Sequence, residues 1–216
     1  MSSADPPVTR LPLTLTTSPR LDASLHQGWE AWSTVVRNLG ASATALWLSQ
    51  RAGDGDLLAA LVPAVAAVLA AEGADEEVES RIELAELAEA VDDLVAETCW
   101  DGVLVVARAV GDGDALAEAT NRLATIAEAD GDVLTAAERH IAFLNWRREP
   151  DSSSDSDAVA TSFEEIVRLA EHDRNPKAAA IYTFRYASFT RLVDREDVRV
   201  VVGDWEADGS PYEAWQ

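Results

Sequence analysis

The histidines and the single cysteine are the side chains of this chain best suited to catalysis or metal binding, and they are widely separated. His26, His140 and His172 match no metal-binding spacing such as His-Glu-x-x-His. Cys99 lies in an apolar helical pattern, which predicts a small buried side chain rather than a nucleophile. The sequence therefore predicts no catalytic residue, no cofactor and no metal. An enzyme with a site assembled from distant residues stays open as an alternative.

Two Asp-Gly-Asp motifs, at residues 54–56 and 112–114, invite comparison with calcium-binding loops. An EF-hand loop needs further oxygen ligands and a closing glutamate, which neither motif supplies. An aspartate just before a helix instead caps the first backbone N–H groups, and a glycine ends the preceding helix. We therefore predict that these aspartates are helix caps.

Arginines and aromatic residues concentrate toward the C-terminus. A partner with an acidic or phosphorylated segment could bind such a cluster. The alternative is that these arginines pair with the acidic helices of the same chain. The members of the cluster are Arg147, Arg148, Arg185, Arg191, Arg195 and Arg199, with Trp146, Tyr182 and Tyr186.

The chain carries a large excess of negative charge. Its 216 residues include 39 acidic and 17 basic ones, for a formal net charge of -22. Binding to phosphates or to an anionic membrane needs concentrated positive charge, so we expect no direct nucleic acid binding and no membrane attachment. A carboxylate-rich surface that retains water and counterions suits the salt-rich cytoplasm of a halophile. A DNA mimic, with carboxylates spaced like phosphates, is the alternative reading of the same charge.

The charge is distributed unevenly. Residues 54–138 contain 21 acidic and 3 basic residues, whereas residues 139–199 contain 11 acidic and 10 basic ones. Such unlike surfaces permit a homo-oligomer whose contacts salt would weaken. The N-terminus carries no signal-like sequence, and the longest apolar run, residues 57–71, is too short to span a bilayer. We therefore predict a cytoplasmic protein.

Apolar residues recur at helical spacing through most of the chain. Leu25, Trp29, Trp32, Val36 and Leu39, for example, are separated by alternating steps of four and three. The pattern predicts an all-α fold of about nine antiparallel helices arranged in hairpins. The expected helices cover residues 22–39, 42–52, 56–73, 75–98, 101–110, 114–130, 132–148, 162–173 and 175–194.

The ends and one internal segment differ in composition from this helical domain, which is predicted over residues 21–195. Residues 1–20 predict a flexible segment, although its leucines at 11, 13 and 15 alternate with polar residues like an edge strand. Residues 198–202 have the pattern of a second short strand, so a minor two-strand element could join the termini. Residues 196–216 are predicted as a strand and aromatic tail, and residues 150–160 as a polar linker.

Residues 121–146 contain two helical patterns joined by Gly131 and Asp132. The spacing of their small and large residues resembles a tetratricopeptide repeat, in a match covering about residues 114–150. The matching residues are Leu123, Ala124, Gly131 and Ala136, with the pair His140 and Phe143. Ala127 departs from the family, which has a bulky aromatic there, and His140 replaces a larger apolar residue. Residues 162–190 form a weaker copy with a different turn.

The resemblance implies a concave surface lined by the first helix of each hairpin, which in this family holds a peptide or a partner helix. The implied partner-binding residues are Glu118, Asn121, Thr125 and Glu128 in the first hairpin, and Arg168 and His172, with Glu164 and Glu171, in the second. The predicted function is therefore a non-enzymatic helical-repeat protein that mediates protein-protein interaction. The alternatives are an enzyme or accessory subunit with a site between hairpins, and an acidic DNA-mimic inhibitor.

Overall fold

The computed structural model describes residues 14–146 and 156–193 of the chain. These residues form ten α-helices and no strand, which confirms the all-α prediction. The helices are α1 Thr14–Leu25, α2 Trp29–Leu39, α3 Ala41–Ala52, α4 Leu58–Ala70, α5 Ala74–Ala88, α6 Asp93–Val110, α7 Gly113–Ala129, α8 Val133–Trp146, α9 Ser156–His172 and α10 Pro176–Val193. In this part of the chain, no helix combines the length and the apolar character that crossing a membrane requires.

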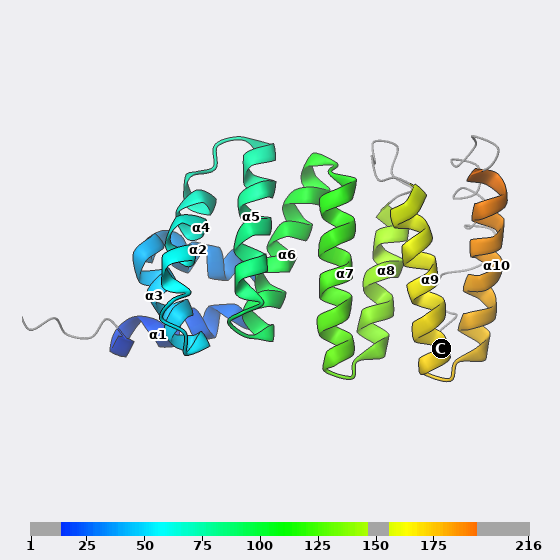
Figure 1. Ribbon diagram of the computed structural model, residues 1–216, viewed down its shortest axis with the longest axis horizontal. Helices are drawn as coiled ribbons and strands as arrows, with labels where there is room; N and C mark the ends of the chain where they lie inside the picture. The colour runs from blue at the N-terminus through cyan, green and yellow to red at the C-terminus, as the bar shows by residue number, and fades with distance from the viewer. Residues whose placement is uncertain (1–13, 147–155, 194–216) are drawn as a thin grey trace, which may run out of the picture.

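Each helix packs against its neighbours in the chain, so the fold is an elongated array (Figure 1). From α5 to α10 the helices stand side by side, with α7 and α9 toward the viewer and α8 behind them. At the other end, α1 and α2 fold back onto α6. This arrangement is compatible with a helical-repeat fold.

The N-terminal core forms around tryptophans and a buried arginine. Trp32 and Trp100 are fully buried, and the Trp29 ring packs against Trp32 with centroids 5.6 Å apart. The Arg81 guanidinium lies 4.6 Å from the Trp29 ring centroid and donates a 2.6 Å hydrogen bond to the Gly102 carbonyl. Gly102 faces the Trp29 ring so closely that a Cβ atom there would lie 2.3 Å from it. Glycine at this position therefore sets the distance between α2 and α6.

The C-terminal core extends from α5 to α10, with Phe163, Ile166 and Tyr182 almost completely buried. A third, smaller cluster joins α7, α8 and α9 through small side chains. Its buried members are Ala124, Ala136, Ala137 and Leu169. Alanines at such contacts allow helix axes to approach more closely than leucines would, because less side-chain volume separates them.

Aspartates at the junctions between helices accept hydrogen bonds from backbone N–H groups near the helix ends. Asp112 accepts hydrogen bonds from the backbone N–H groups of Asp114 and Ala115 at 3.1 and 3.0 Å, which confirms the cap predicted for Asp112, whereas Asp114 lies inside α7 and is not a cap. In the 54–56 motif the prediction for Asp56 is wrong, because α4 begins at Leu58 without a side-chain cap. There Asp54 accepts from the Asp56 N–H at 2.9 Å and forms a turn instead.

Two predicted helix boundaries are wrong. The helix expected over residues 22–39 is divided into α1 and α2 at Gly28, whose positive φ of 84° is incompatible with a continuous right-handed helix. The helix expected over 75–98 ends at Ala88. Asp92 then caps α6 by accepting from the Val95 N–H at 2.9 Å, so the segment 101–110 continues α6 rather than forming a helix of its own.

Both segments predicted as irregular are partly helical. Helix α1 begins at Thr14 and contains Pro19, so Leu15 lies in a helix rather than an edge strand. Helix α9 begins at Ser156, inside the expected polar linker, because its strongly amphipathic pattern extends upstream to the buried Val159. The remaining parts of the predicted strands, residues 11–13 and 198–202, and the C-terminal tail lie outside the described residues.

The contact between Gly102 and Trp29 leads to a stability prediction. Replacing Gly102 with alanine places a methyl group inside the van der Waals radius of the Trp29 ring, so Gly102→Ala should lower the free energy of unfolding by about 1–3 kcal/mol. This loss exceeds the gain of about 0.5–1 kcal/mol expected for alanine in a helix interior. Urea unfolding followed by circular dichroism measures the difference.

The matched control is Gly55→Ala, because a Cβ atom at Gly55 meets open space. Its free energy of unfolding should stay within about 0.5 kcal/mol of the parent chain. A Gly102→Ala variant as stable as Gly55→Ala would contradict the close approach of α2 and α6.

Candidate binding groove

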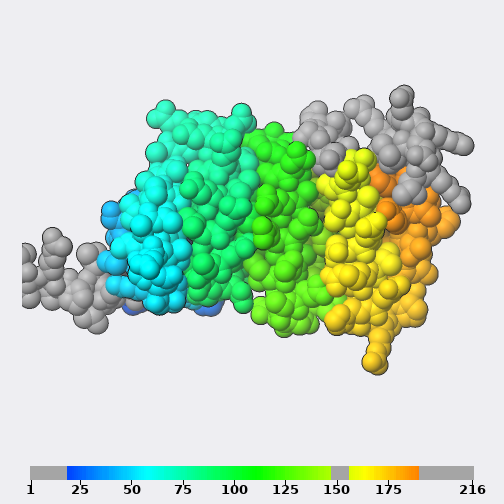
Figure 2. Space-filling model, in the orientation of Figure 1, coloured from blue at the N-terminus to red at the C-terminus, as the bar shows by residue number. Residues whose placement is uncertain are grey.

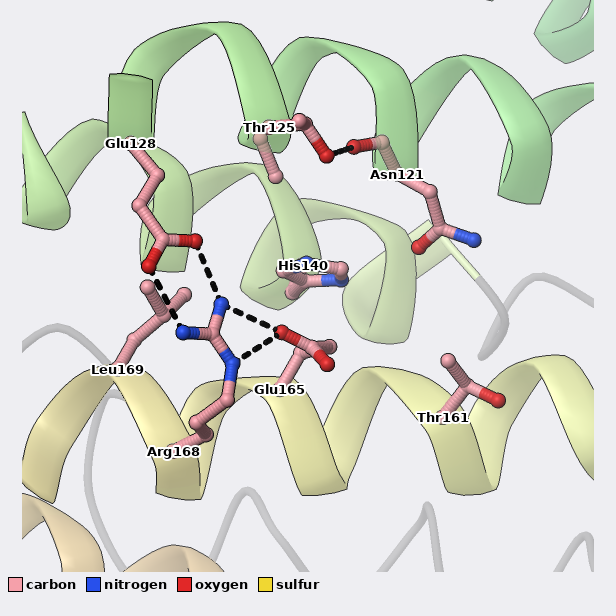
Figure 3. A pocket seen from close by; sticks show the side chains of 9 residues that line it. Asn121, Thr125, Glu128, His140, Thr161, Glu165, Arg168 and Leu169 are labelled. Atoms are coloured by element: carbon pink, nitrogen blue, oxygen red, sulfur yellow. Dashed lines mark hydrogen bonds and ion pairs between the residues drawn. The ribbon is translucent and has the colours of Figure 1, made fainter. Parts of the chain in front are cut away.

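A groove of about 490 Å³ lies between α7 and α9, with α8 as its floor. Figure 2 shows the face of the molecule on which α7, in green, and α9, in yellow, lie, and Figure 3 shows the side chains of the groove. The lining residues are Asn121, Ala124, Thr125 and Glu128 from α7, His140 from α8, and Thr161, Glu165, Arg168 and Leu169 from α9.

The polar side chains of the two walls follow the same spacing. Residues at positions i, i+4 and i+7 lie on one face of an α-helix, and both walls place their polar side chains in this order. We name these sets the α7 triplet, which is Asn121, Thr125 and Glu128, and the α9 triplet, which is Thr161, Glu165 and Arg168. The groove therefore has two matched polar edges, with Ala124 and Leu169 as its apolar part.

Arg168 connects the two walls. Its Nη1 and Nη2 atoms donate to the two carboxylate oxygens of Glu128 at 2.7 and 2.6 Å, a bidentate pair that spans from α9 to α7. Its Nε atom donates to Glu165 on its own helix at 2.8 Å (Figure 3). The hydrogen bonds from Arg168 lower the pKa of the Glu128 carboxyl, and those to Glu128 and Glu165 raise the pKa of the guanidinium. The Glu128 carboxylate and the Arg168 guanidinium are therefore both charged at neutral pH.

His140 forms part of the floor between the two walls (Figure 3). Its side chain is almost fully buried, and its Nδ1 atom lies 3.4 Å from the Ser162 hydroxyl. Burial lowers the pKa of the imidazole from its usual 6.5 to about 4, although the nearby Glu165 and Glu128 act in the opposite direction. At neutral pH the ring is therefore uncharged and keeps one nitrogen lone pair as a hydrogen-bond acceptor.

The structure brings together four of the residues predicted to bind a partner. Asn121, Thr125, Glu128 and Arg168 all line the groove, and they come from both walls. Glu118 lies outside the lining and pairs with Arg122 on its own helix, with nitrogen and oxygen 3.9 Å apart.

The other predicted residues of the second hairpin also lie outside the lining. The charge of His172 contributes to lowering the Glu128 pKa, but His172 does not line the groove. Glu164 accepts a 2.6 Å hydrogen bond from the Tyr186 hydroxyl. Glu171 is exposed elsewhere on α9.

His140, Thr161 and Glu165 line the groove but were not among the predicted binding residues. Thr161 was missed because the helix was expected to begin only at Ser162, after this residue. Glu165 follows from Arg168 by the i, i+3 rule, which places both on one helix face. His140 was interpreted as a packing residue of the second helix in the hairpin, and it is indeed buried, but it also reaches the floor of the groove.

The predicted basic and aromatic cluster is only partly described. Arg185 is buried, with its guanidinium 5.4 Å from the Tyr182 ring centroid, so it contributes little to a binding surface. Residues 147–148, 195 and 199 lie outside the described part of the chain. The binding of an acidic partner at this cluster stays a prediction.

No group of three or more His, Cys, Asp or Glu side chains suited to holding a metal ion occurs in residues 14–146 and 156–193. Cys99 is buried, and burial raises the pKa of its thiol. No protein-family model, curated protein or solved structure matches this chain. The class of the protein is therefore defined by its helices, as an all-α array compatible with a helical-repeat fold.

The buried imidazole gives a pH prediction. Because the folded-state pKa of His140 lies near 4 and its unfolded value near 6.5, the unfolded chain binds a proton first as the pH falls. The stabilising contribution of neutral His140 is therefore fully present above pH 6.5. Between pH 6.5 and pH 4 the free energy of unfolding should fall by roughly 3 kcal/mol as this contribution is lost. The free energy of unfolding, measured at several pH values for the parent chain and for His140→Gln, tests this.

The comparison with His140→Gln separates the histidine from its charged neighbours Glu128, Glu165 and Arg168, which are present in both proteins. The stability advantage of the parent chain over the variant should shrink by roughly 3 kcal/mol between pH 7 and pH 4. An advantage that does not change with pH would show that His140 keeps an ordinary pKa in the folded chain.

Proposed function

We propose that this chain is a non-enzymatic helical-repeat protein that binds a segment of a partner protein in the groove between α7 and α9. The observation that carries the proposal is the matched spacing of the α7 and α9 triplets across an open groove. Two polar edges in the same register offer hydrogen-bonding groups at regular intervals along one line. An extended chain segment has backbone and side-chain groups at regular intervals too, whereas a compact small molecule does not.

The size of the groove indicates how much of a segment it contacts. From its first to its last residue each triplet rises by seven residue steps of helix, or about 10 Å. An extended chain rises about 3.3 Å per residue, so about three residues of a partner lie between the walls. Such a short contact supports weak and reversible binding rather than a permanent assembly.

The resemblance of the α7–α8 hairpin to a tetratricopeptide repeat supports the same proposal. Leu123, Ala136 and Phe143, which carry part of this resemblance, are all buried at helix contacts. Gly131 ends the first helix of the hairpin with a φ of 81°, a conformation that favours glycine. In proteins of that family the groove between successive first helices holds a peptide, and α7 and α9 correspond to such helices.

The chemistry of the groove also favours binding over catalysis. Both carboxylates accept hydrogen bonds from Arg168, so the oxygens engaged in these pairs are not free to take part in proton transfer. His140 lies beneath them with a pKa near 4, too low for an efficient general base at neutral pH. These groups fix the shape of the groove and its hydrogen-bonding pattern.

Binding in the groove can be tested with the purified full chain and a displayed library of random 12-residue peptides. Peptides selected by the chain should lose affinity when the groove is filled. We expect Thr125→Trp to weaken their binding by at least about tenfold, because the indole occupies the space between the walls. Fluorescence anisotropy with labelled selected peptides measures the dissociation constants.

Thr183→Trp on α10 is the matched control. Thr125 and Thr183 are both exposed, and each donates its hydroxyl hydrogen to the backbone carbonyl four residues earlier, at 2.8 and 2.7 Å. Thr183→Trp should change affinity by less than about twofold. If no peptide is selected, or if both variants bind equally well, the proposed groove is not the binding site.

A further inference from the structure

The hydrogen-bonding groups of the groove consist mainly of acceptors. Among its nine lining residues, the carboxylates of Glu128 and Glu165 provide about four acceptor positions each, and Arg168 engages only a part of them. The Thr125 hydroxyl donates its hydrogen to the Asn121 carbonyl at 2.8 Å, so toward the groove its oxygen is an acceptor. The neutral His140 ring has one donor and one acceptor nitrogen and so adds no positive charge. Two carboxylates against one guanidinium give the lining a formal charge of -1.

An anionic ligand does not fit this arrangement. The one cation of the lining, Arg168, already points its Nε, Nη1 and Nη2 atoms at Glu128 and Glu165. A carboxylate or phosphate from a partner would have to replace these pairs while lying beside the two carboxylates that it displaces. The repulsion between like charges a few ångströms apart opposes this.

From these contacts we infer that the partner segment carries a lysine or arginine, and that its cationic side chain binds the carboxylates of Glu128 and Glu165. The inference rests on the proposed function, because it names the chemistry of the segment that enters the same groove. Arg168 then acts as an internal competitor: its guanidinium holds the position between the carboxylates that the partner's cation takes. Its side chain is 48% exposed, so it can turn out toward solvent without disturbing the core.

The charge of the surrounding chain favours the same ligand. Residues 54–138, which form the array from α4 to α7 and the start of α8, contain 21 acidic and 3 basic residues. Their summed field concentrates cations near the α7 wall and raises the association rate of a basic segment. Because the carboxylates are partly exposed, added salt should weaken the binding by screening.

The selection from the peptide library is the first test. Peptides whose binding is weakened by Thr125→Trp should be enriched in lysine and arginine relative to the unselected library. For one such peptide, replacing its basic residues with glutamine should weaken binding by at least about tenfold.

Removing the internal competitor, Arg168, should strengthen the binding of the basic peptide. Arg168→Gln should bind the basic peptide about tenfold more tightly than the parent chain and should not improve binding of the glutamine peptide.

Arg122→Gln is the matched control for the change in net charge. Arg122 also pairs with two carboxylates, that of Glu118 on its own helix and that of Glu89 at the end of α5. The nitrogen-oxygen distances are 3.9 and 3.4 Å, and the Arg122 side chain is 43% exposed. It does not line the groove, so Arg122→Gln should leave the affinity for the basic peptide within about twofold of that of the parent chain.

Two further variants change the charged groups of the groove. Arg168→Lys retains the charge but not the bidentate geometry, and its affinity for the basic peptide should lie between those of the parent and Arg168→Gln. The double variant Glu128→Gln, Glu165→Gln should weaken binding by at least about tenfold.

Three results would overturn the inference while leaving a peptide groove in place. They are enrichment of acidic or uncharged peptides, weaker binding by Arg168→Gln, and equal gains for Arg168→Gln and Arg122→Gln. In the second case Arg168 would be a direct ligand of an anionic partner. In the third the gain would reflect net charge alone. A library that produces no peptide sensitive to Thr125→Trp would instead reject the proposed function itself. Circular dichroism spectra and melting temperatures of all variants establish that each one is folded.

Discussion

Close contact between neighbouring helices depends on the small side chains at their interfaces. Many of the fully buried residues are alanines, and they occur at helix contacts along the whole array. Gly102 is the extreme case, because the Trp29 ring occupies the space of its missing Cβ atom. A helix held this closely has few alternative positions, so the array keeps a defined spacing although only 6% of the residues are aromatic. The positions of α7, α8 and α9, and hence of the groove walls, follow from this packing.

The groove exists because α8 contacts both α7 and α9 while these two helices stand apart above it. The alanines of the small cluster bring α8 close beneath them, and Leu169 reaches down from α9 to the same cluster. Above this apolar layer only polar side chains face each other across the gap. The bidentate pair between Arg168 and Glu128 then connects two walls that otherwise have little direct contact. Packing positions the walls, and the charged side chains of Arg168, Glu128 and Glu165 line the space between them.

The helical periodicity predicted the fold class and the order of the helices, because the repeat of apolar residues depends only on local geometry. It failed at Gly28 and Asp92, where a single residue ends or begins a helix inside a continuous apolar pattern. Four of the nine residues that line the groove, Asn121, Thr125, Glu128 and Arg168, are among those that the resemblance of the hairpin implied. The contribution of His140 could not be predicted in the same way. Whether a buried histidine also borders a surface groove depends on how three helices meet, which no local pattern contains.

The two ends of the array are held differently, and this affects how the chain folds. Because α1 and α2 contact α6, the N-terminal half is closed by contacts between residues far apart in sequence. From α6 onward each helix is held mainly by its immediate neighbours, as in one-dimensional repeat proteins whose units form and melt in succession. Unfolding that starts at α10 would therefore reach α9 before it reaches α7. In that order the wall that carries Arg168 would open before the α7 wall, and a segment bound in the groove would oppose this opening by coupling α9 to α7.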